Sequence, residues 1–148
     1  MSLKVIQGPL KDKSLLSDVM KIYTKRESKR KNRRMDFIPY IKHHYFSGLV
    51  WAMETLASHY TFCFFLNNQL AAFMTGFVTN YNEIVFPYVA IDNKFASYTP
   101  GKLMISESIK YLQAHGSIRG LDMSRGDERY KLEMGGVRHY NYRFEIQL

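Results

Sequence analysis

Residues 83–123 decide the fold through three segments: EIVFPYVAI at Glu83–Ile91, TPGKLM at 99–104 and SIRGLDM at 117–123. The first segment is rich in β-branched and aromatic residues and predicts a strand, in which Pro87 indicates a bulge or an edge position. Thr99 and Pro100 predict the start of a helix that ends near Gly116. Residues 118–123 predict a second strand. This order predicts a right-handed crossover between two parallel strands.

The segments on both sides of this unit predict one mixed sheet. Residues 60–66 and 70–78 are apolar runs joined by Asn67-Asn68-Gln69, which indicates a hairpin. Helices are predicted for residues 15–23, 37–45, 47–58 and 127–134, with Ser14, Asp36 and Asp127 as caps of the first, second and fourth. Alternation over 137–146 predicts a last strand. We therefore expect an α+β, or mixed α/β, fold.

The composition limits the class of protein. The chain has 148 residues, of which 46% are hydrophobic, and this suits one domain with a core of its own. The single cysteine, Cys63, excludes a disulfide framework and is expected to be a core residue. No apolar run reaches the roughly 18 residues that span a bilayer, and no signal peptide is evident, so we expect a cytoplasmic protein. Met1-Ser2-Leu3 could be an expression leader.

Positive charge is concentrated in one run, KRESKRKNRR, from Lys25 to Arg34. The run holds seven of the 21 basic residues and one acid, which gives it a net charge of +6. Because the whole chain has a net charge of +8, the rest of the chain has a net charge of only +2. Such a run attracts nucleic acid, an anionic membrane face or a phosphorylated cofactor. It also fits a solvated loop or helix end, which we favour. The run contains no aromatic residue, and so it lacks the side chains on which the bases of a single strand would stack.

Several common chemistries have no motif in this chain. The sequence contains no GxGxxG after a strand, no GxxxxGK[ST] and no GxSxG. His43 and His44 are adjacent and would point about 100° apart on a helix, which makes them a poor metal pair. We therefore expect no metal site.

The second half of the chain resembles the GNAT acyltransferase superfamily, and within it the branch of CelD-like and FemABX-type proteins. The segments that carry the resemblance are FLNNQLAA (65–72), YTPGKLM (98–104), HG (115–116), GLDM (120–123), GDERYK (126–131) and MGG (134–136). Their order and spacing match the family over about residues 60–140. The resemblance implies a central pair of splayed parallel strands and a helix whose N-terminus faces the diphosphate of an acyl carrier.

The resemblance implies a donor site at the start of that helix. Free backbone N–H groups and the positive end of the helix dipole favour a phosphate. Thr99, Gly101 and Lys102 would bind the diphosphate, and Val89 and Ile91 on the first parallel strand would lie along the donor. A backbone N–H near Val89 would polarise the acyl carbonyl.

The resemblance also suggests catalytic residues. Tyr130 would give a proton to the leaving thiolate, although a packing role is equally open. Asp122 could orient an amine or cap a turn, and Glu83 or Glu128 could relay a proton from the incoming ammonium. Lys131 could contact an anionic group, or pair with Glu128 or Asp127.

The resemblance implies an N-acyltransferase that moves an acyl group, and most simply an acetyl group, from coenzyme A to an amine of a small molecule or peptide. Only one glycine, Gly101, marks the diphosphate loop. CelD-like proteins share this reduced loop, and it also fits the aminoacyl-tRNA donor of FemABX relatives. One GNAT-like unit rather than two favours acyl-CoA. A third alternative is a non-catalytic domain that binds anions or nucleic acid through residues 25–34.

Overall fold

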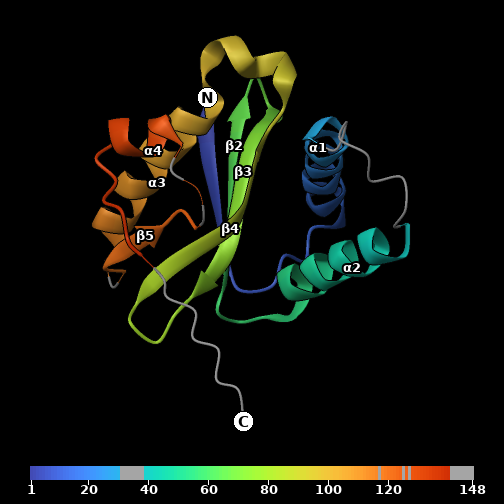
Figure 1. The fold of residues 1–148 in the computed structure, drawn as a ribbon, viewed down its shortest axis with the longest axis horizontal. Helices are drawn as coiled ribbons and strands as arrows, with labels where there is room; N and C mark the ends of the chain where they lie inside the picture. Colours follow the sequence, from blue (N-terminus) through green and yellow to red (C-terminus); the bar gives the residue numbers. More distant parts are fainter. Residues whose placement is uncertain (31–38, 117, 125, 127, 141–148) are drawn as a thin grey trace.

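A five-stranded sheet separates two layers of helices (Figure 1). The structure is a computed structural model that describes residues 1–30, 39–116, 118–124, 126 and 128–140, and the side chains of these except 28–30 and 39–46. In chain order the elements are β1 (Ser2–Gln7), α1 (Lys13–Arg30), α2 (Pro39–Thr55), β2 (His59–Leu66), β3 (Gln69–Val78), β4 (Glu83–Ile91), the 3-10 helix η1 (Asn93–Tyr98), α3 (Pro100–His115), β5 (Gly120–Asp122) and α4 (Arg129–Glu133). The predicted α+β fold is confirmed.

The strands lie in sequence order, β1-β2-β3-β4-β5. The first four are antiparallel neighbours, and β4 and β5 are parallel. The crossover between β4 and β5 runs through α3, as the sequence predicted. Within the described residues, no helix is long and apolar enough to cross a membrane.

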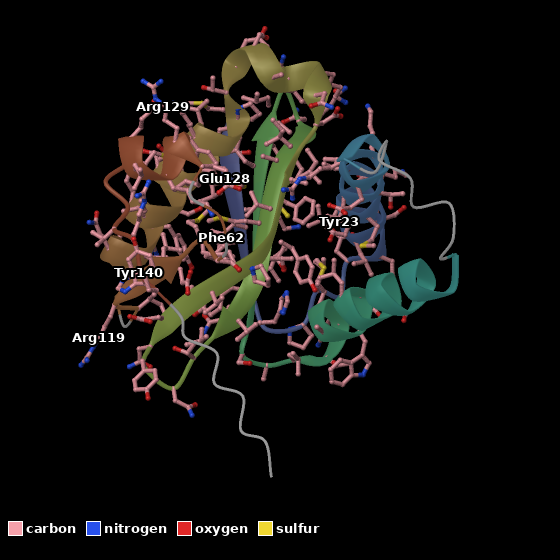
Figure 2. The ribbon with its side chains drawn as sticks, in the orientation of Figure 1. Tyr23, Phe62, Arg119, Glu128, Arg129 and Tyr140 are labelled. Atoms are coloured by element: carbon pink, nitrogen blue, oxygen red, sulfur yellow. The ribbon has the colours of Figure 1, made fainter. Side chains whose placement is uncertain are left out.

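Both faces of the central strands are buried, which explains why β2 and β3 read as continuous apolar runs. Phe62 faces the α3 side, while Tyr23 of α1 packs on the opposite face (Figure 2). There the Tyr23 ring meets Phe73 edge-on at 6.3 Å between centroids and Tyr88 at 5.7 Å. These contacts fix α1 across β3 and β4, and so place its C-terminal half near the end of β4.

The parallel pair β4–β5 is joined over a short stretch only. The ladder pairs Glu83 with Gly120 and ends with Val85 and Asp122, whereas β4 continues to Ile91. The register of β3 and β4 shifts between Thr75 and Phe77, so that Phe86 and Pro87 oppose the single residue Gly76. This is the bulge that Pro87 predicted. It begins directly after the last residue of β4 that pairs with β5.

The N-terminal third differs from the sequence predictions. A strand not predicted from the sequence, the edge strand β1, pairs Ser2 and Leu3 with Phe65 and Phe64. The expression leader at residues 1–3 stays a prediction. Asp12 rather than Ser14 caps α1, because its Oδ1 accepts the backbone N–H of Leu15 at 3.0 Å. Helix α1 then continues to Arg30 and takes up the first part of the basic run, since Lys and Arg are good helix formers.

Two further predictions need correction. The break expected before Ser47 is absent, and a single helix, α2, covers Pro39–Thr55. The strand expected over 137–146 does not form over residues 137–140, where Val137 is 80% and Tyr140 75% exposed. The predicted caps Asp36 and Asp127, and residues 141–146, lie outside the described residues. The alternation over 137–146 had suggested a half-buried strand, but residues 137–140 are exposed.

Candidate active site

Two peptide groups near the end of β4 point away from β3, beyond the last pair of the β4–β5 ladder. The N–H of Asp92 donates to the carbonyl of Ala71 on β3 at 2.8 Å. Because consecutive residues of a strand alternate in direction, the N–H and C=O groups of Val89 and Ile91 point away from β3. The ladder with β5 has already ended at Val85. The backbone groups of Val89 and Ile91 therefore lie beyond the paired part of β4 and β5, and we call the region between the end of β4 and the residues that follow β5 the wedge.

The start of α3 lies beside the end of β4. A Cβ on Gly101 would sit 3.3 Å from Cγ2 of Ile91, so the two residues are in close contact. The carbonyl of Thr99 accepts the N–H groups of Lys102 and Leu103 at 3.0 and 3.3 Å. The helix N-terminus and the wedge thus form one continuous site, which contains every residue predicted to bind the donor.

Thr99 does not cap α3 in the predicted way. It adopts a left-handed conformation with φ of 47°, and its side chain makes no capping hydrogen bond. The reason is that Thr99 also ends η1, where its N–H donates to Ala96 O at 3.0 Å. A β-branched residue in this conformation is strained. The side chain of Thr99 therefore accepts none of the free backbone N–H groups in the first turn of α3.

Lys102 extends from this first turn toward α4. Its Nζ is 2.8 Å from Oε2 of Glu133, whose other oxygen contacts Arg129 Nε at 2.9 Å. The hydrogen bond from Lys102 is the main cause that holds the pKa of Glu133 below its ordinary value. Both partners are largely exposed, so the pair contributes little to stability and Lys102 can exchange Glu133 for another anion.

Tyr130 lies in α4 and is half-buried against the core on the α3 side of the sheet. Burial raises the pKa of its phenol. The charges of Lys131 and Arg26 act in the opposite direction, and Glu128 adds to the increase. The phenol is thus protonated at neutral pH, as a proton donor must be.

Lys131 holds together the loop between β5 and α4. Its Nζ donates to the carbonyls of Met123 at 3.1 Å and Gly126 at 3.1 Å, and it pairs with Glu128 Oε2 at 2.9 Å. The hydrogen bond from Lys131 to the Glu128 carboxylate is the main cause that lowers the pKa of Glu128. Of the alternatives that the sequence left open, Lys131 therefore pairs with Glu128. The contacts fix the turn from which Tyr130 extends.

The other two predicted catalytic residues lie at the two ends of the β4–β5 ladder, Glu83 at its first pair and Asp122 at its last. Asp122 is exposed, and its Oδ1 accepts the N–H of Ser124 at 2.6 Å, so it caps a turn. Glu83 pairs with Gly120 at the closed end of the ladder. At about 3.3 Å per residue, Glu83 is about 26 Å from Ile91 along β4. The structure therefore brings Tyr130, but not Glu83, to the wedge side of the molecule.

Arg26 is the residue that the sequence did not single out. Its guanidinium donates to the carbonyl oxygen of Val89, and its charge acts on both Tyr130 and Glu128. Glu128 lies on the same side of the sheet as α4, opposite the layer that contains Tyr23 (Figure 2). Arg26 therefore reaches from α1 across the end of β4 into the wedge. In the sequence it was one of seven basic residues in a run, with no signal that set it apart.

A second contact ties α1 to the end of β4. Lys25 Nζ is 3.5 Å and Lys94 Nζ 3.3 Å from the carboxylate of Asp92. Burial alone would raise the pKa of Asp92, but hydrogen bonds from Lys94 and the charge of Lys25 lower it. Asp92 is therefore a charged anchor for both lysines. Two cations of the basic run thus lie at the candidate site.

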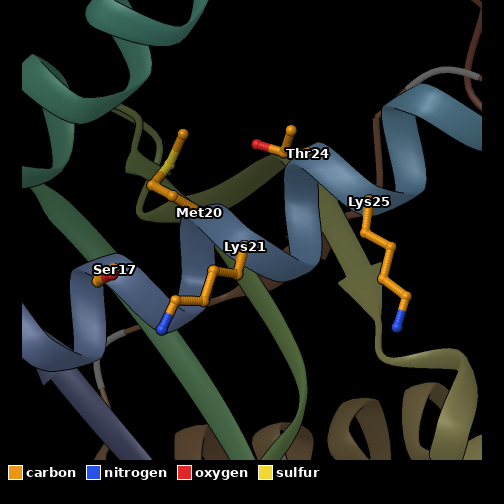
Figure 3. Close-up of a pocket in the computed structure, with 5 residues that line it drawn as sticks. All are labelled: Ser17, Met20, Lys21, Thr24 and Lys25. Carbon is orange, nitrogen blue, oxygen red and sulfur yellow. The ribbon is translucent and has the colours of Figure 1, made fainter.

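A shallow depression runs along α1 and ends near this anchor (Figure 3). It is lined by Ser17, Met20, Lys21, Thr24 and Lys25. Lys25 links the depression to Asp92, directly after β4. The depression therefore approaches the wedge from the α1 side.

Other chemistries find no support at the described side chains. Cys63 is fully buried, and burial raises the pKa of its thiol to about 12, so it is a core residue as predicted. Among the described residues, no three His, Cys, Asp or Glu side chains are grouped to hold a metal. The side chains of His43 and His44 lie outside this description.

A known family matches most of the chain. The model of the acetyltransferase (GNAT) domain matches residues 9–132. A comparison with curated proteins found no significant match. Among solved structures, a tetramutant of the BH1408 protein from Bacillus halodurans has a TM-score of 0.67 at 16% identity and covers 100% of both chains.

Two aminoglycoside acetyltransferases have the same fold. One, from an uncultured soil metagenomic sample and in complex with sisomicin, has a TM-score of 0.57 at 17% identity and covers 97% of both chains. The other, AAC(6')-Iy in complex with the bisubstrate analogue CoA-S-monomethyl-acetylneamine, has a TM-score of 0.57 at 10% identity and covers 100% of this chain and 99% of its own. The narrower CelD-like or FemABX-related assignment stays a prediction. The family match over residues 9–132 shows that this chain belongs to the GNAT acetyltransferases.

Proposed function

We propose that this protein transfers an acetyl group from acetyl-CoA to the amine of a small molecule. The observation that carries this proposal is the early end of the β4–β5 ladder at Val85 and Asp122, with the start of α3 against Ile91. A wedge beside a helix N-terminus can accept an extended thioester and its diphosphate together. The family match supports acetyl-CoA as the donor, because GNAT acetyltransferases use it.

The residues at the start of α3 fit the donor's diphosphate. Pro100 has no N–H, and Gly101 presents its N–H at the first turn, where no intrahelical acceptor exists. Gly101 also has no side chain, so the diphosphate could approach the helix backbone closely. Lys102 supplies a cation that an exposed pair with Glu133 holds only weakly. Bound acetyl-CoA would supply the thioester.

The residues of the wedge support the acyl transfer itself. The N–H of Val89 is directed into the wedge and is proposed to polarise the thioester carbonyl. The neutral amine nitrogen forms the new C–N bond, the C–S bond breaks, and the phenol of Tyr130 gives its proton to the departing sulfur. The proton lost by the amine goes to solvent, and the phenolate of Tyr130 takes a proton back from solvent, which restores the phenol. Glu83 has no part in this scheme, because it lies at the closed end of the ladder.

Calorimetry tests the donor site directly. We expect acetyl-CoA to bind the protein, and S-acetylpantetheine, which lacks the diphosphate, to bind at least about tenfold more weakly. Release of free thiol from acetyl-CoA in the presence of primary amines then tests the transfer. Absence of binding to acetyl-CoA would overturn the proposal.

The aminoacyl-tRNA donor and the non-catalytic anion-binding domain remain the alternatives. The basic run favours them, because it would contact RNA. However, its described cations Lys25 and Arg26 are directed at Asp92 and Val89. Salt-dependent RNA binding that requires residues 29–34, without binding of acetyl-CoA, would favour these alternatives.

A further inference from the structure

We infer that Arg26 selects the acceptor: the amine substrate carries an anionic group close to its reacting nitrogen, and Arg26 binds that group in the wedge. This inference rests on the proposed acetyl transfer and adds the chemical class of the acceptor. Its starting point is the contact between the guanidinium of Arg26 and the carbonyl oxygen of Val89.

Arg26 lacks a carboxylate partner in the part of the chain that the structure describes. Its hydrogen bond goes to a neutral carbonyl, and none of the ion pairs between described side chains includes it. The residue is only half exposed. A partly desolvated guanidinium gains more from a carboxylate or phosphate, which it can bind through two parallel hydrogen bonds, than from a carbonyl. The site thus holds a cation for which an incoming anion would supply the charged partner.

The nearby carboxylates are already bound by other cations. Asp92 is shared between Lys25 and Lys94, and Glu128 is held by Lys131. The charge of Arg26 also acts on Glu128, but the two carboxylates are shared among four cations, so the end of β4 carries a surplus of positive charge. A polycationic acceptor would meet repulsion there, whereas an anionic one would be attracted.

The position of Arg26 sets how far the anion lies from the amine. The N–H and C=O of Val89 belong to one residue and are about 3 Å apart. If the N–H polarises the thioester carbonyl, the guanidinium on the C=O lies within a few ångströms of the attacking amine. The recognised anion must therefore be near that amine in the molecule, as in an amino acid or a short ω-amino acid.

Matched acceptor series test this inference. The first series is γ-aminobutyrate, its amide and putrescine, and the second is glycine, glycinamide and ethylenediamine. Each series keeps a primary amine and changes the far group from anion to neutral to cation. Because the far group also shifts the pKa of the amine, the rates are compared per concentration of neutral amine. Thiol release at saturating acetyl-CoA gives kcat/KM for each acceptor. We expect the carboxylate of at least one series to exceed its amide by about tenfold or more, and the diamine to be the poorest.

Variants show whether Arg26 is the cause. Arg26→Gln should reduce the ratio of carboxylate to amide by about tenfold, and Arg26→Lys should retain part of it. Lys110→Gln, at the far side of α3 where Lys110 pairs with Glu107, is the control and should leave the ratio unchanged. The affinity for acetyl-CoA and the thermal unfolding midpoint of each variant show that the site remains folded.

The possible results separate the two proposals. If acetyl-CoA does not bind, or releases no thiol with any amine, the proposed function fails and this inference fails with it. If thiol is released but the diamines or amides are preferred, or if Arg26→Gln leaves the ratio unchanged, only the inference on the acceptor is overturned.

Discussion

Val85 and Asp122 are the last two residues that pair between the parallel strands β4 and β5. Directly after Val85, residues Phe86 and Pro87 bulge opposite Gly76 of β3. A bulge bends its strand and increases the local twist, and Pro87 cannot donate to a neighbouring strand. The opening of the wedge therefore has a local cause in the sequence of β4.

Gly76 makes the bulge possible, and its replacement tests this cause. A Cβ at Gly76 would lie 1.8 Å from the carbonyl oxygen of Val85. Because the clash is with the backbone, only a rearrangement of the backbone could relieve it. We expect Gly76→Ala to lower the free energy of unfolding by about 3 kcal/mol or more, as measured by urea denaturation.

Gly48→Ala is the matched control for Gly76→Ala. Gly48 lies within α2, and a Cβ there would meet no atom within 4 Å. The same substitution should therefore raise the free energy of unfolding by about 0.5–1 kcal/mol, because alanine is the better helix former. Equal effects at the two positions would show that the close approach at Gly76 is not a constraint.

The pair of Lys102 with Glu133 predicts opposite effects on donor binding. Lys102→Gln removes the cation and should weaken the affinity for acetyl-CoA by about two- to fivefold, more at low salt. Glu133→Gln releases Lys102 and Arg129 and should strengthen it by a similar or smaller factor. Calorimetric dissociation constants at two salt concentrations measure both.

Lys110→Gln is the control for this pair of variants. Lys110 also lies on α3, and its contact with Glu107 at 2.7 Å resembles that of Lys102 with Glu133 at 2.8 Å. It lies away from the helix N-terminus, so its loss should leave the affinity unchanged. Equal losses for Lys102→Gln and Lys110→Gln would mean that only the overall charge of the protein matters.

The phenol of Tyr130 is expected to act in the chemical step and not in donor binding. Tyr130→Phe keeps the half-buried ring and removes only the hydroxyl, so kcat should fall on the order of 100-fold while the dissociation constant of acetyl-CoA stays unchanged. In the wild type, kcat should decline at high pH as the phenol ionises, and the variant should lack this decline. An unchanged kcat would leave Tyr130 as a packing residue.

The sequence predicted the segments of the candidate donor site and missed how α1 reaches them. The hairpin, the strand Glu83–Ile91 and the helix start at Thr99 carry local signals, because aromatic runs and the Thr-Pro-Gly turn depend on short-range preferences. Arg26 carries none, since its contact with Val89 spans 63 residues. Only the packing of α1 on β4 selects it from the basic run.

The errors at the ends of the chain have a similar physical origin. Residues 137–140 alternate as a strand does, but alternation does not show whether a sheet edge is available for pairing. Conversely, β1 has a weak pattern and gains its register from pairing with β2. Asp12 and Ser14 are both good helix caps, so composition could not decide between them.

His59 provides a test of the core that is independent of catalysis. It begins β2, is only 2% exposed, and its Nε2 contacts the hydroxyl of Thr75. Its Nδ1 has no hydrogen-bond partner among the described residues. Burial lowers the pKa of His59 from 6.5 to about 4. The folded protein therefore keeps this imidazole neutral in a range where the unfolded chain binds a proton.

This difference in proton binding destabilises the fold as the pH falls from 6.5 to 4. Above pH 6.5 both states are neutral and His59 adds no pH dependence, whereas below that value only the unfolded state gains a proton. At about 1.4 kcal/mol per pH unit, the loss reaches up to about 3 kcal/mol near pH 4. Urea unfolding at intervals of pH should show that His59→Gln removes this part of the slope. The exposed His115, changed to Gln in the same way, should leave the slope intact, and equal slopes for wild type and His59→Gln would contradict a neutral buried imidazole.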